Sequence, residues 1–96
     1  SHEVLQVVRE ALHNAQKHSK ASKVVLLVEK TDNSLQILIE DDGSGFPFGG
    51  SYNLEELELM RMGPESIKRR VRTLNGELTL ESTPGRGAKL RVRVPL

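Results

Sequence analysis

The chain has 96 residues with 14 basic and 13 acidic side chains, which gives a net charge of only +1. This balance excludes a general electrostatic attraction to nucleic acid or to anionic lipid. No cysteine is present, so disulfides and thiolate metal sites are excluded and an intracellular location is permitted. No apolar run approaches the ~18 residues of a membrane span and no signal peptide is recognisable, so we expect one soluble domain.

The first predicted element is an amphipathic helix over residues 3–17. Its apolar residues recur at intervals of three and four, as one buried helix face requires: Val4, Leu5, Val8, Ala11, Leu12 and Ala15. Glu10, Asn14 and Lys17 fall within about 60° of one another, away from the centre of that stripe. A carboxylate, an amide and an ammonium therefore share one surface, which on an average helix is simply a solvated face.

Residues 24–29 and 35–40 are predicted to pair as an antiparallel hairpin. The first run is apolar on both faces, which is typical of a central strand with cover on both sides. The second run alternates, with apolar residues at 35, 37 and 39, and the intervening residues 31–33 (TDN) have turn chemistry.

The second strand ends at the sequence DDGSG, residues 41–45. Asp41 and Asp42 stand at the strand end, and Gly43 and Gly45 allow positive φ and close approach of another molecule. A small ligand is the natural candidate for that approach. Asp and Gly also dominate ordinary turns, so the segment by itself favours ligand binding and a plain turn about equally.

Residues 46–62 are predicted to form a long connection between elements. Its first part is rich in glycine and proline and is expected to be loose, while Asn53 and Glu56 offer a capping box for a short helix to about residue 62. Connections of this length are usually functional lids or disordered segments. We therefore expect a mobile lid at residues 46–62.

The second half of the chain predicts a helix followed by two strands. The helix begins at residues 63–64 (GP), with proline at its first position, and ends at residues 75–76 (NG), which tolerate a left-handed cap. Residues 77–82 and 88–94 alternate as strands and are joined by a glycine-rich connection. The order predicts an α+β fold: a two-layer sandwich with a mainly antiparallel sheet, helices on one face, and the lid between a strand and the second main helix.

The second main helix carries a basic cluster, and the chain carries three histidines. The basic residues are Lys68, Arg69, Arg70 and Arg72, and we favour solvent-facing charges over a contact to phosphate or to another domain. The histidines at 2, 13 and 18 lack metal-ligand partners, so no catalytic role is assigned to them.

Four short motifs follow one another along residues 1–96. They are residues 9–18 (REALHNAQKH), residues 41–45 (DDGSG), residues 63–71 (GPESIKRRV) and residues 84–87 (PGRG). Together they resemble the N box and the three glycine boxes of the ATP-binding catalytic domain of sensor histidine kinases. That family belongs to a superfamily with gyrase B, the mismatch-repair ATPases and the ATP-dependent heat-shock chaperone. The amino-acid sequences of the first and third motifs are most similar to those of the nitrate/nitrite sensor type.

The resemblance implies a domain that binds ATP and Mg²⁺ and donates the γ-phosphoryl group to a histidine on a separate dimerisation domain. It implies catalytic roles for Glu10 and Lys17 and metal coordination by Asn14. The implied nucleotide-binding residues are Asn14, Lys17, Asp41, Gly43, Gly45, Gly63, Gly85 and Gly87. The family usually has Thr where this chain has Ala88, which removes a hydroxyl near the adenine.

Elementary chemistry agrees with these roles. Magnesium takes hard oxygen ligands and keeps several waters, so the Asn14 amide oxygen and the nucleotide phosphates suffice as a site. Glu10 is placed to accept a proton or to orient a water, and Lys17 offers a point charge for phosphate oxygens. The helix start at residues 63–64 exposes N–H groups suited to phosphate, and Asp41 can accept the hydrogen bond of the adenine amino group.

The resemblance also implies partners, a location and alternatives. The parent would be a bacterial, homodimeric, inner-membrane sensor with this domain in the cytoplasm, a response regulator as partner and no nucleic acid. The chain is expected to be N-terminally truncated, because it begins at the N-box helix. Alternatives within the superfamily are an anti-sigma-factor serine kinase and a gyrase-like ATP-driven module, for which the chain is too short to hold a transducer domain. Outside the superfamily, the alternative is a non-nucleotide interaction domain, such as one that binds nucleic acid through the basic helix.

Overall fold

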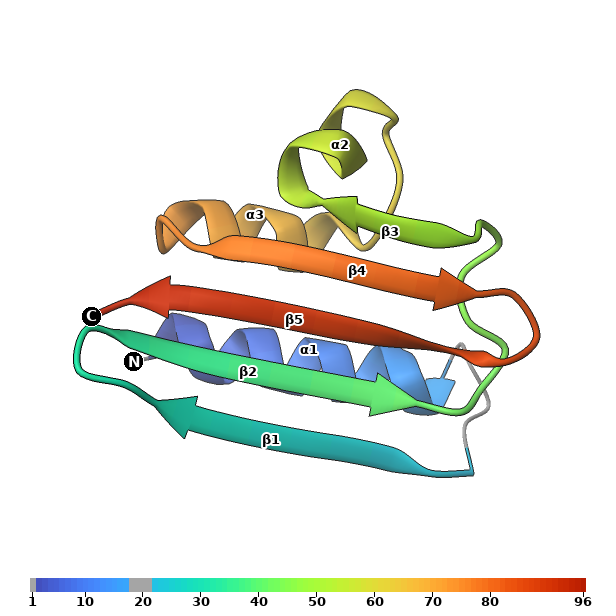
Figure 1. The fold of residues 1–96 in the computed structure, drawn as a ribbon, viewed down its shortest axis with the longest axis horizontal. Helices are drawn as coiled ribbons and strands as arrows, with labels where there is room; N and C mark the ends of the chain where they lie inside the picture. Colours follow the sequence, from blue (N-terminus) through green and yellow to red (C-terminus); the bar gives the residue numbers. More distant parts are fainter. Residues whose placement is uncertain (1, 18–21) are drawn as a thin grey trace.

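The fold is a two-layer α+β sandwich in which two helices cover one face of a five-stranded sheet (Figure 1). The computed structural model describes the backbone of residues 2–17 and 22–96 and the side chains of residues 2–14 and 22–96. Its helices are α1 (His2–Lys17), α2 (Leu54–Leu59) and α3 (Glu65–Thr73). Its strands are β1 (Val24–Lys30), β2 (Ser34–Asp41), β3 (Gly50–Asn53), β4 (Glu77–Thr83) and β5 (Gly87–Pro95). The predicted fold class is confirmed.

The strands lie in the order β1-β2-β5-β4-β3, and every neighbouring pair is antiparallel. The first predicted hairpin forms with Leu27 opposite Leu38. Because β5 lies between β2 and β4, the glycine-rich connection between β4 and β5 reaches the end of β2 (Figure 1). There the Gly85 N–H donates to the Ser44 carbonyl oxygen at 2.7 Å. Two glycine-rich segments that are far apart in the sequence therefore meet at one end of the sheet.

The hydrophobic core lies between the sheet and the pair α1 and α3. Alternate residues of β2, β4 and β5 point toward the helices, and each helix contributes one apolar face. The buried hydrophobic residues are Val7, Ala11, Ile37, Ile39, Leu57, Ile67, Val71, Leu78, Leu80, Leu90, Val92 and Val94. Burial of a large aliphatic side chain is worth about 1.5 to 3 kcal/mol, so this cluster holds both helices against the sheet.

β1 is an edge strand, so the prediction of a central strand with cover on both faces is wrong. Leu26, Leu27 and Val28 remain 40%, 57% and 55% exposed. The reason is the width of the helix layer, since α1 packs against β2 and α3 packs against β4. An apolar run on both faces of a strand does not fix the place of that strand in the sheet.

Residues 50–53 form a strand, where the sequence predicted a loose segment. β3 pairs with β4 and places Tyr52 opposite Leu80. The Phe46 and Phe48 rings stack with centroids 5.4 Å apart, and Phe48 meets Tyr52 edge-on at 5.6 Å. Contacts between these aromatic rings therefore stabilise a segment that its glycine and proline content had predicted to be loose.

The helix ends follow the predicted cap chemistry with small shifts. Asn53 Oδ1 accepts the Glu56 N–H at 2.8 Å and the Glu56 carboxylate accepts the Asn53 N–H at 2.9 Å, which confirms the capping box. α2 ends at Leu59, earlier than predicted. Pro64 is the N-cap of α3 and not its first residue, and Asn75 takes the left-handed conformation (φ 56°) that ends the helix.

Lys68 is buried, which contradicts the interpretation of the basic cluster as solvent-facing. Its side chain is 2% exposed, and its Nζ lies 2.9 Å from Glu65 Oε1. Lys68 shares the buried side of α3 with Ile67 and Val71, so its aliphatic stem takes the place of an apolar residue. Arg69 and Arg72, by contrast, are exposed as predicted.

Replacing Lys68 with alanine is expected to lower the free energy of unfolding by about 2 kcal/mol, because a buried stem is lost and a void remains. Lys68→Met keeps most of that volume and removes a buried charge, so its free energy of unfolding should stay within about 1 kcal/mol of the parent value or exceed it. Urea unfolding measures both variants. If methionine destabilises as much as alanine, the ammonium and its pair with Glu65, and not the stem, stabilise this helix.

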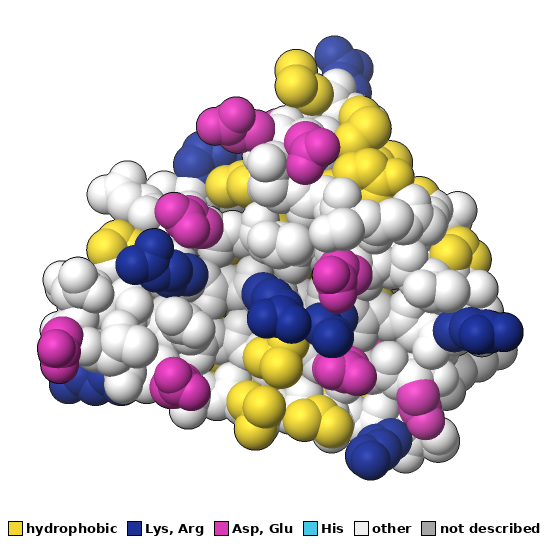
Figure 2. Space-filling model, in the orientation of Figure 1, with side chains coloured by type: hydrophobic (Ala, Val, Ile, Leu, Met, Phe, Trp, Pro, Cys, Tyr) yellow, Lys and Arg dark blue, Asp and Glu magenta, His cyan; other side chains and the backbone are white. Residues whose placement is uncertain are grey.

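The face of the sheet that points away from the helices carries alternating charges (Figure 2). Lys89 Nζ lies 3.7 Å from Glu40 and 3.9 Å from Glu81, and Arg93 Nη1 lies 3.8 Å from Glu77. Such exposed pairs contribute at most about 1 kcal/mol each. Among the described helices, none is long and apolar enough to cross a membrane.

Candidate functional site

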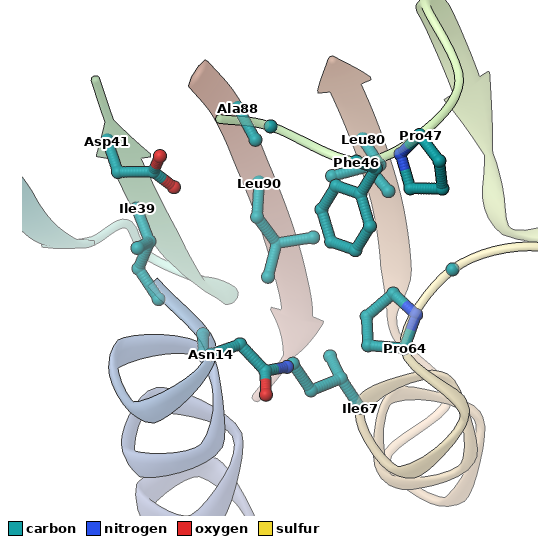
Figure 3. Close-up of a pocket in the computed structure, with 13 residues that line it drawn as sticks. Asn14, Ile39, Asp41, Phe46, Pro47, Pro64, Ile67, Leu80, Ala88 and Leu90 are labelled. Atoms are coloured by element: carbon teal, nitrogen blue, oxygen red, sulfur yellow. The ribbon is translucent and has the colours of Figure 1, made fainter. Parts of the chain in front are cut away.

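A cavity of about 400 Å³ opens between the helix layer and one end of the sheet (Figure 3). Two cross-strand rows on the helix-facing side of β2, β5 and β4 form its floor, and α1, α3 and two turns form its walls. The lining residues are Ala11, Asn14, Ile39, Asp41, Gly45, Phe46, Pro47, Gly63, Pro64, Ile67, Leu80, Ala88 and Leu90. A mainly apolar lining with a few polar groups is the usual construction of a small-molecule site, for which volumes of about 300 to 1,000 Å³ are common.

Asp41 places a carboxylate at the sheet end of the cavity (Figure 3). Its Oδ1 accepts the Gly43 N–H at 2.9 Å, and its Oδ2 has no hydrogen-bond partner among the described residues. In the neighbouring strand Ala88 stands opposite Asp41, and its small side chain leaves the carboxylate open. One oxygen is thus fixed by the backbone while the other can accept a hydrogen bond from a ligand.

Asp42 is exposed and serves the structure of the hairpin. Its Oδ1 accepts the N–H groups of Ser22 and Lys23, both at 2.9 Å, and its Oδ2 accepts the Ser22 hydroxyl at 2.7 Å. The Ser22 hydroxyl and then the Lys23 N–H hold the pKa of Asp42 below its ordinary value. Of the two adjacent carboxylates, only Asp41 belongs to the cavity.

The glycines that the sequence marked as nucleotide-binding fall into two groups. Gly45 and Gly63 line the cavity and have φ of 73° and 89°, in the left-handed region that favours glycine. The remaining three, Gly43, Gly85 and Gly87, lie outside the lining.

Gly45 and Gly87 allow close backbone packing beside the cavity. A Cβ on Gly87 would lie 2.1 Å from the Asp41 carbonyl oxygen, and a Cβ on Gly45 would lie 2.7 Å from the Gly87 carbonyl oxygen. The end of β2, the turn that follows it and the start of β5 therefore interlock without side chains between them. This packing fixes the backbone that carries the Asp41 carboxylate.

The three polar residues predicted on α1 also differ in where they lie relative to the cavity. Asn14 lines the cavity, and its amide has no hydrogen-bond partner among the described residues. Glu10 lies outside the lining, and its Oε1 accepts a hydrogen bond from Arg70 Nε at 2.9 Å. Lys17 ends α1, and its side chain lies outside the described residues, as does His18.

Glu10 is held as a carboxylate. Burial by itself raises the pKa of Glu10, but the Ser66 hydroxyl and the Arg70 guanidinium together outweigh burial and lower that pKa below its ordinary value, with Arg69 adding a weaker attraction. Its Oε2 is buried and has no hydrogen-bond partner among the described residues. A charged acceptor with one free oxygen therefore stands one helical turn before Asn14.

The first turn of α3 adjoins the cavity. Gly63, Pro64 and Ile67 line it, and the N-cap Pro64 makes no side-chain cap bond. The first N–H groups of a helix have no partner within the helix, and the helix dipole adds partial positive charge there. This end of the cavity therefore suits an anion such as phosphate.

The sequence did not mark the apolar lining as part of a site. Ile39, Leu80, Leu90 and Ile67 were assigned to strand and helix faces, and Phe46 and Pro47 to a connection. The strand pairing supplies what was missing, because Ile39 and Leu80 stand on either side of Leu90 in one row. Among the described residues, no group of three or more His, Cys, Asp or Glu side chains is arranged to hold a metal ion.

Comparison with known proteins gives the family. The whole chain, residues 1–96, matches the family described as histidine kinase-, DNA gyrase B- and HSP90-like ATPase. It is 38% identical over 90 residues to the sensor histidine kinase ComP of Bacillus subtilis, which covers 94% of this chain and 11% of ComP. It is 50% identical over 44 residues to the nitrate/nitrite sensor protein NarX of Escherichia coli, which covers 46% of this chain and 7% of NarX.

A solved structure supports the same assignment. The ATP binding domain of PrrB from Mycobacterium tuberculosis matches with a TM-score of 0.71 and 28% identity, over 97% of this chain and 66% of that one. The chain spans about a tenth of the length of ComP. The predicted resemblance to sensor histidine kinases is confirmed, and the chain belongs to the histidine kinase-, DNA gyrase B- and HSP90-like ATPase family.

Proposed function

We propose that this domain binds Mg-ATP in the cavity and donates the γ-phosphoryl group to a histidine on a separate dimerisation domain of the same sensor kinase. One observation carries the proposal. In a chain matched over its whole length by an ATPase family, a mainly apolar cavity holds the Asp41 carboxylate on the sheet side and the Asn14 amide on the helix side.

The sheet end of the cavity suits the adenine base. Asp41 Oδ2 accepts the hydrogen bond of the exocyclic amino group, and Ile39, Leu80 and Leu90 provide an apolar bed for the flat ring. Gly45 keeps the turn above the base free of a side chain. Gly43 contributes through its N–H bond to Asp41, which fixes the recognising carboxylate.

The helix end of the cavity suits the phosphates. The free N–H groups at the start of α3 bind phosphate oxygens, with Gly63 at the turn before them, and Lys17 adds a positive charge. Magnesium fits here because one amide oxygen, from Asn14, is enough when the phosphates and water supply the remaining hard ligands. The metal, when bound, neutralises charge on the phosphate oxygens. Gly85 and Gly87 support the site through the packing described above.

Transfer depends on position and charge more than on covalent chemistry by the protein. Glu10 is the carboxylate on α1 one turn before Asn14, and its role is to orient a water or the attacking group; its lowered pKa makes it a weak proton acceptor. Residues 46–62 are the proposed lid: Phe46 and Pro47 line the cavity, whereas β3 is paired with β4 and Leu57 of α2 is buried in the core. The partners are the phosphoacceptor domain and a response regulator, and the parent is a homodimeric, membrane-anchored bacterial sensor with this domain in the cytoplasm.

With radiolabelled ATP, the chain alone should carry no label on histidine, whereas the helical domain of the full-length kinase added in trans should become labelled. His2 and His13 are exposed on the helix that bears Asn14 and cannot move into line with the γ-phosphate. Asn14→Ala should abolish the transfer, and Gln36→Ala, an amide on the far face of the sheet, is the matched control. Acid-labile label on this chain, or transfer that survives Asn14→Ala, would contradict the proposal.

A further inference from the structure

Arg70 joins the two helices that wall the cavity. Its partly buried side chain extends from α3 to α1, where Nε donates to Glu10 Oε1 at 2.9 Å and Nη1 donates to Glu3 Oε2 at 3.3 Å. Glu3 and Glu10 are seven residues apart, so they lie two turns from each other on one face of α1. One planar guanidinium therefore holds α1 at two points, which a single ammonium does not do.

This bridge lies one helical turn from the cavity on both helices. Glu10 precedes Asn14 by four residues and Arg70 follows Ile67 by three, so each pair shares a helix face. Asn14 and Ile67 both line the cavity, and Asn14 extends from α1 toward Ile67 of α3 (Figure 3). The helix spacing at Arg70 therefore sets how far the Asn14 amide stands from α3.

The bridge from Arg70 engages only one of the two carboxylate oxygens of Glu10. Arg70 occupies Oε1 of Glu10, while Oε2 stays buried and without a hydrogen-bond partner among the described residues. The groups that face this carboxylate are Ser66, Arg69 and Arg70 of α3, and Glu3 shares Arg70 from the same helix. Contacts from Arg70 and Ser66 hold this carboxylate, so its Oε2 keeps one direction relative to Asn14.

We propose that Arg70 is a positioning residue for the nucleotide site: its bridge to Glu3 and Glu10 fixes the width of the cavity between α1 and α3 and thereby the place of Asn14. The inference rests on the proposed binding of Mg-ATP and extends it to a residue outside the cavity lining. Arg70 touches neither nucleotide nor metal in this role and acts through Glu10 and α1.

Arg70→Gln should weaken binding of Mg-ATP by about three- to tenfold, the range expected for a residue that acts through a neighbour. The matched control is Arg93→Gln, which removes an exposed pair with Glu77 on the far face of the sheet and should leave the affinity unchanged. Calorimetry gives the affinities, and urea unfolding shows that each variant is folded. Arg70→Lys, which keeps the charge but not the two-point contact, should fall between Arg70→Gln and the parent.

A double-mutant cycle separates positioning from a general loss of stability. If Arg70 acts by placing Asn14, the effect of Arg70→Gln on Mg-ATP affinity should largely vanish in the Asn14→Ala background. Additive effects, or parent affinity in Arg70→Gln and Arg70→Lys, would overturn the inference.

A readout without nucleotide keeps this inference distinct from the proposed function. The side-chain amide resonances of Asn14 should shift in Arg70→Gln and stay in place in Arg93→Gln. If the parent does not bind ATP, the proposed function fails, and these resonances still decide the positioning role. Unmoved Asn14 resonances in Arg70→Gln would overturn it whether or not ATP binds.

Discussion

Asp41→Asn is expected to lower the affinity for ATP by about ten- to a hundredfold, the effect of losing a hydrogen bond to a charged acceptor. The variant should keep the fold, because an asparagine Oδ1 can still accept the Gly43 N–H that Asp41 Oδ1 now accepts at 2.9 Å. The amide NH2 of the introduced asparagine then replaces Oδ2, so two hydrogen-bond donors, this NH2 and the exocyclic amino group of adenine, face each other. Calorimetric titration with ATP measures the loss.

The adjacent carboxylate provides the control for this experiment. Asp42→Asn removes the same charge one residue away, but Asp42 binds Ser22 and Lys23 and does not line the cavity, so ATP affinity should be unchanged. Inosine triphosphate, with a carbonyl oxygen in place of the amino group, should lose less affinity than ATP in Asp41→Asn. Equal affinity of parent and Asp41→Asn for ATP would mean that the base is not read at this carboxylate.

The helices and the strands β1, β2, β4 and β5 could be predicted in order from the sequence because local patterns define them. The three- and four-residue spacing on α1, the alternation in β2, β4 and β5, and the capping box before α2 are local signals. The place of β1 in the sheet is not local: it depends on the width of the helix layer, which no pattern within residues 24–29 records. β3 was missed because its packing comes from Phe46, Phe48 and Tyr52, three rings spaced along a segment dominated by glycine and proline.

Of the polar residues marked in the sequence, Asp41 and Asn14 line the cavity and Glu10 lies outside the lining, while the apolar lining was not marked. Asp41 and Asn14 were marked because the motifs that hold them, residues 41–45 and 9–18, resemble those of a known family; a carboxylate at a strand end and an amide on a helix face are ordinary by themselves. Leu80 and Leu90 carry no such signal, since a strand residue facing a cavity and one facing a helix look alike in sequence. Arg70 was assigned to solvent because its partners Glu3 and Glu10 lie more than fifty residues away in the chain.

The glycines of two motifs show how the site depends on the packing of the fold. The motif at residues 41–45 and the motif at residues 84–87 were both interpreted as contacts to nucleotide, yet Gly87 packs on the backbone of Asp41. The absence of a side chain at residue 87 thus matters first for the fold, and only through the fold for the carboxylate that we propose reads the base.

Gly87→Ala is therefore expected to destabilise the domain by about 3 to 5 kcal/mol, since it adds backbone strain to an overlap that no rotamer relieves. Gly87 has φ 128° and is buried, and its Cβ would stand 2.1 Å from the Asp41 carbonyl oxygen and 3.0 Å from the carbonyl carbon. Both neighbours are backbone of β2, so β5 must move away from β2 to make room. A loss of this size is a large part of the ~5 to 15 kcal/mol that stabilises a typical domain.

Gly85→Ala in the same connection distinguishes the free-energy cost of backbone strain from the cost of atomic overlap. Gly85 also has positive φ (81°), but a Cβ there would meet nothing within 4 Å, so only the left-handed conformation of alanine costs free energy, about 1 to 2 kcal/mol. Urea unfolding of the two variants gives the difference directly. If Gly87→Ala costs no more than Gly85→Ala, β2 and β5 can separate at little cost at this end of the sheet, and the backbone of Asp41 is not fixed by the packing of Gly87 against it.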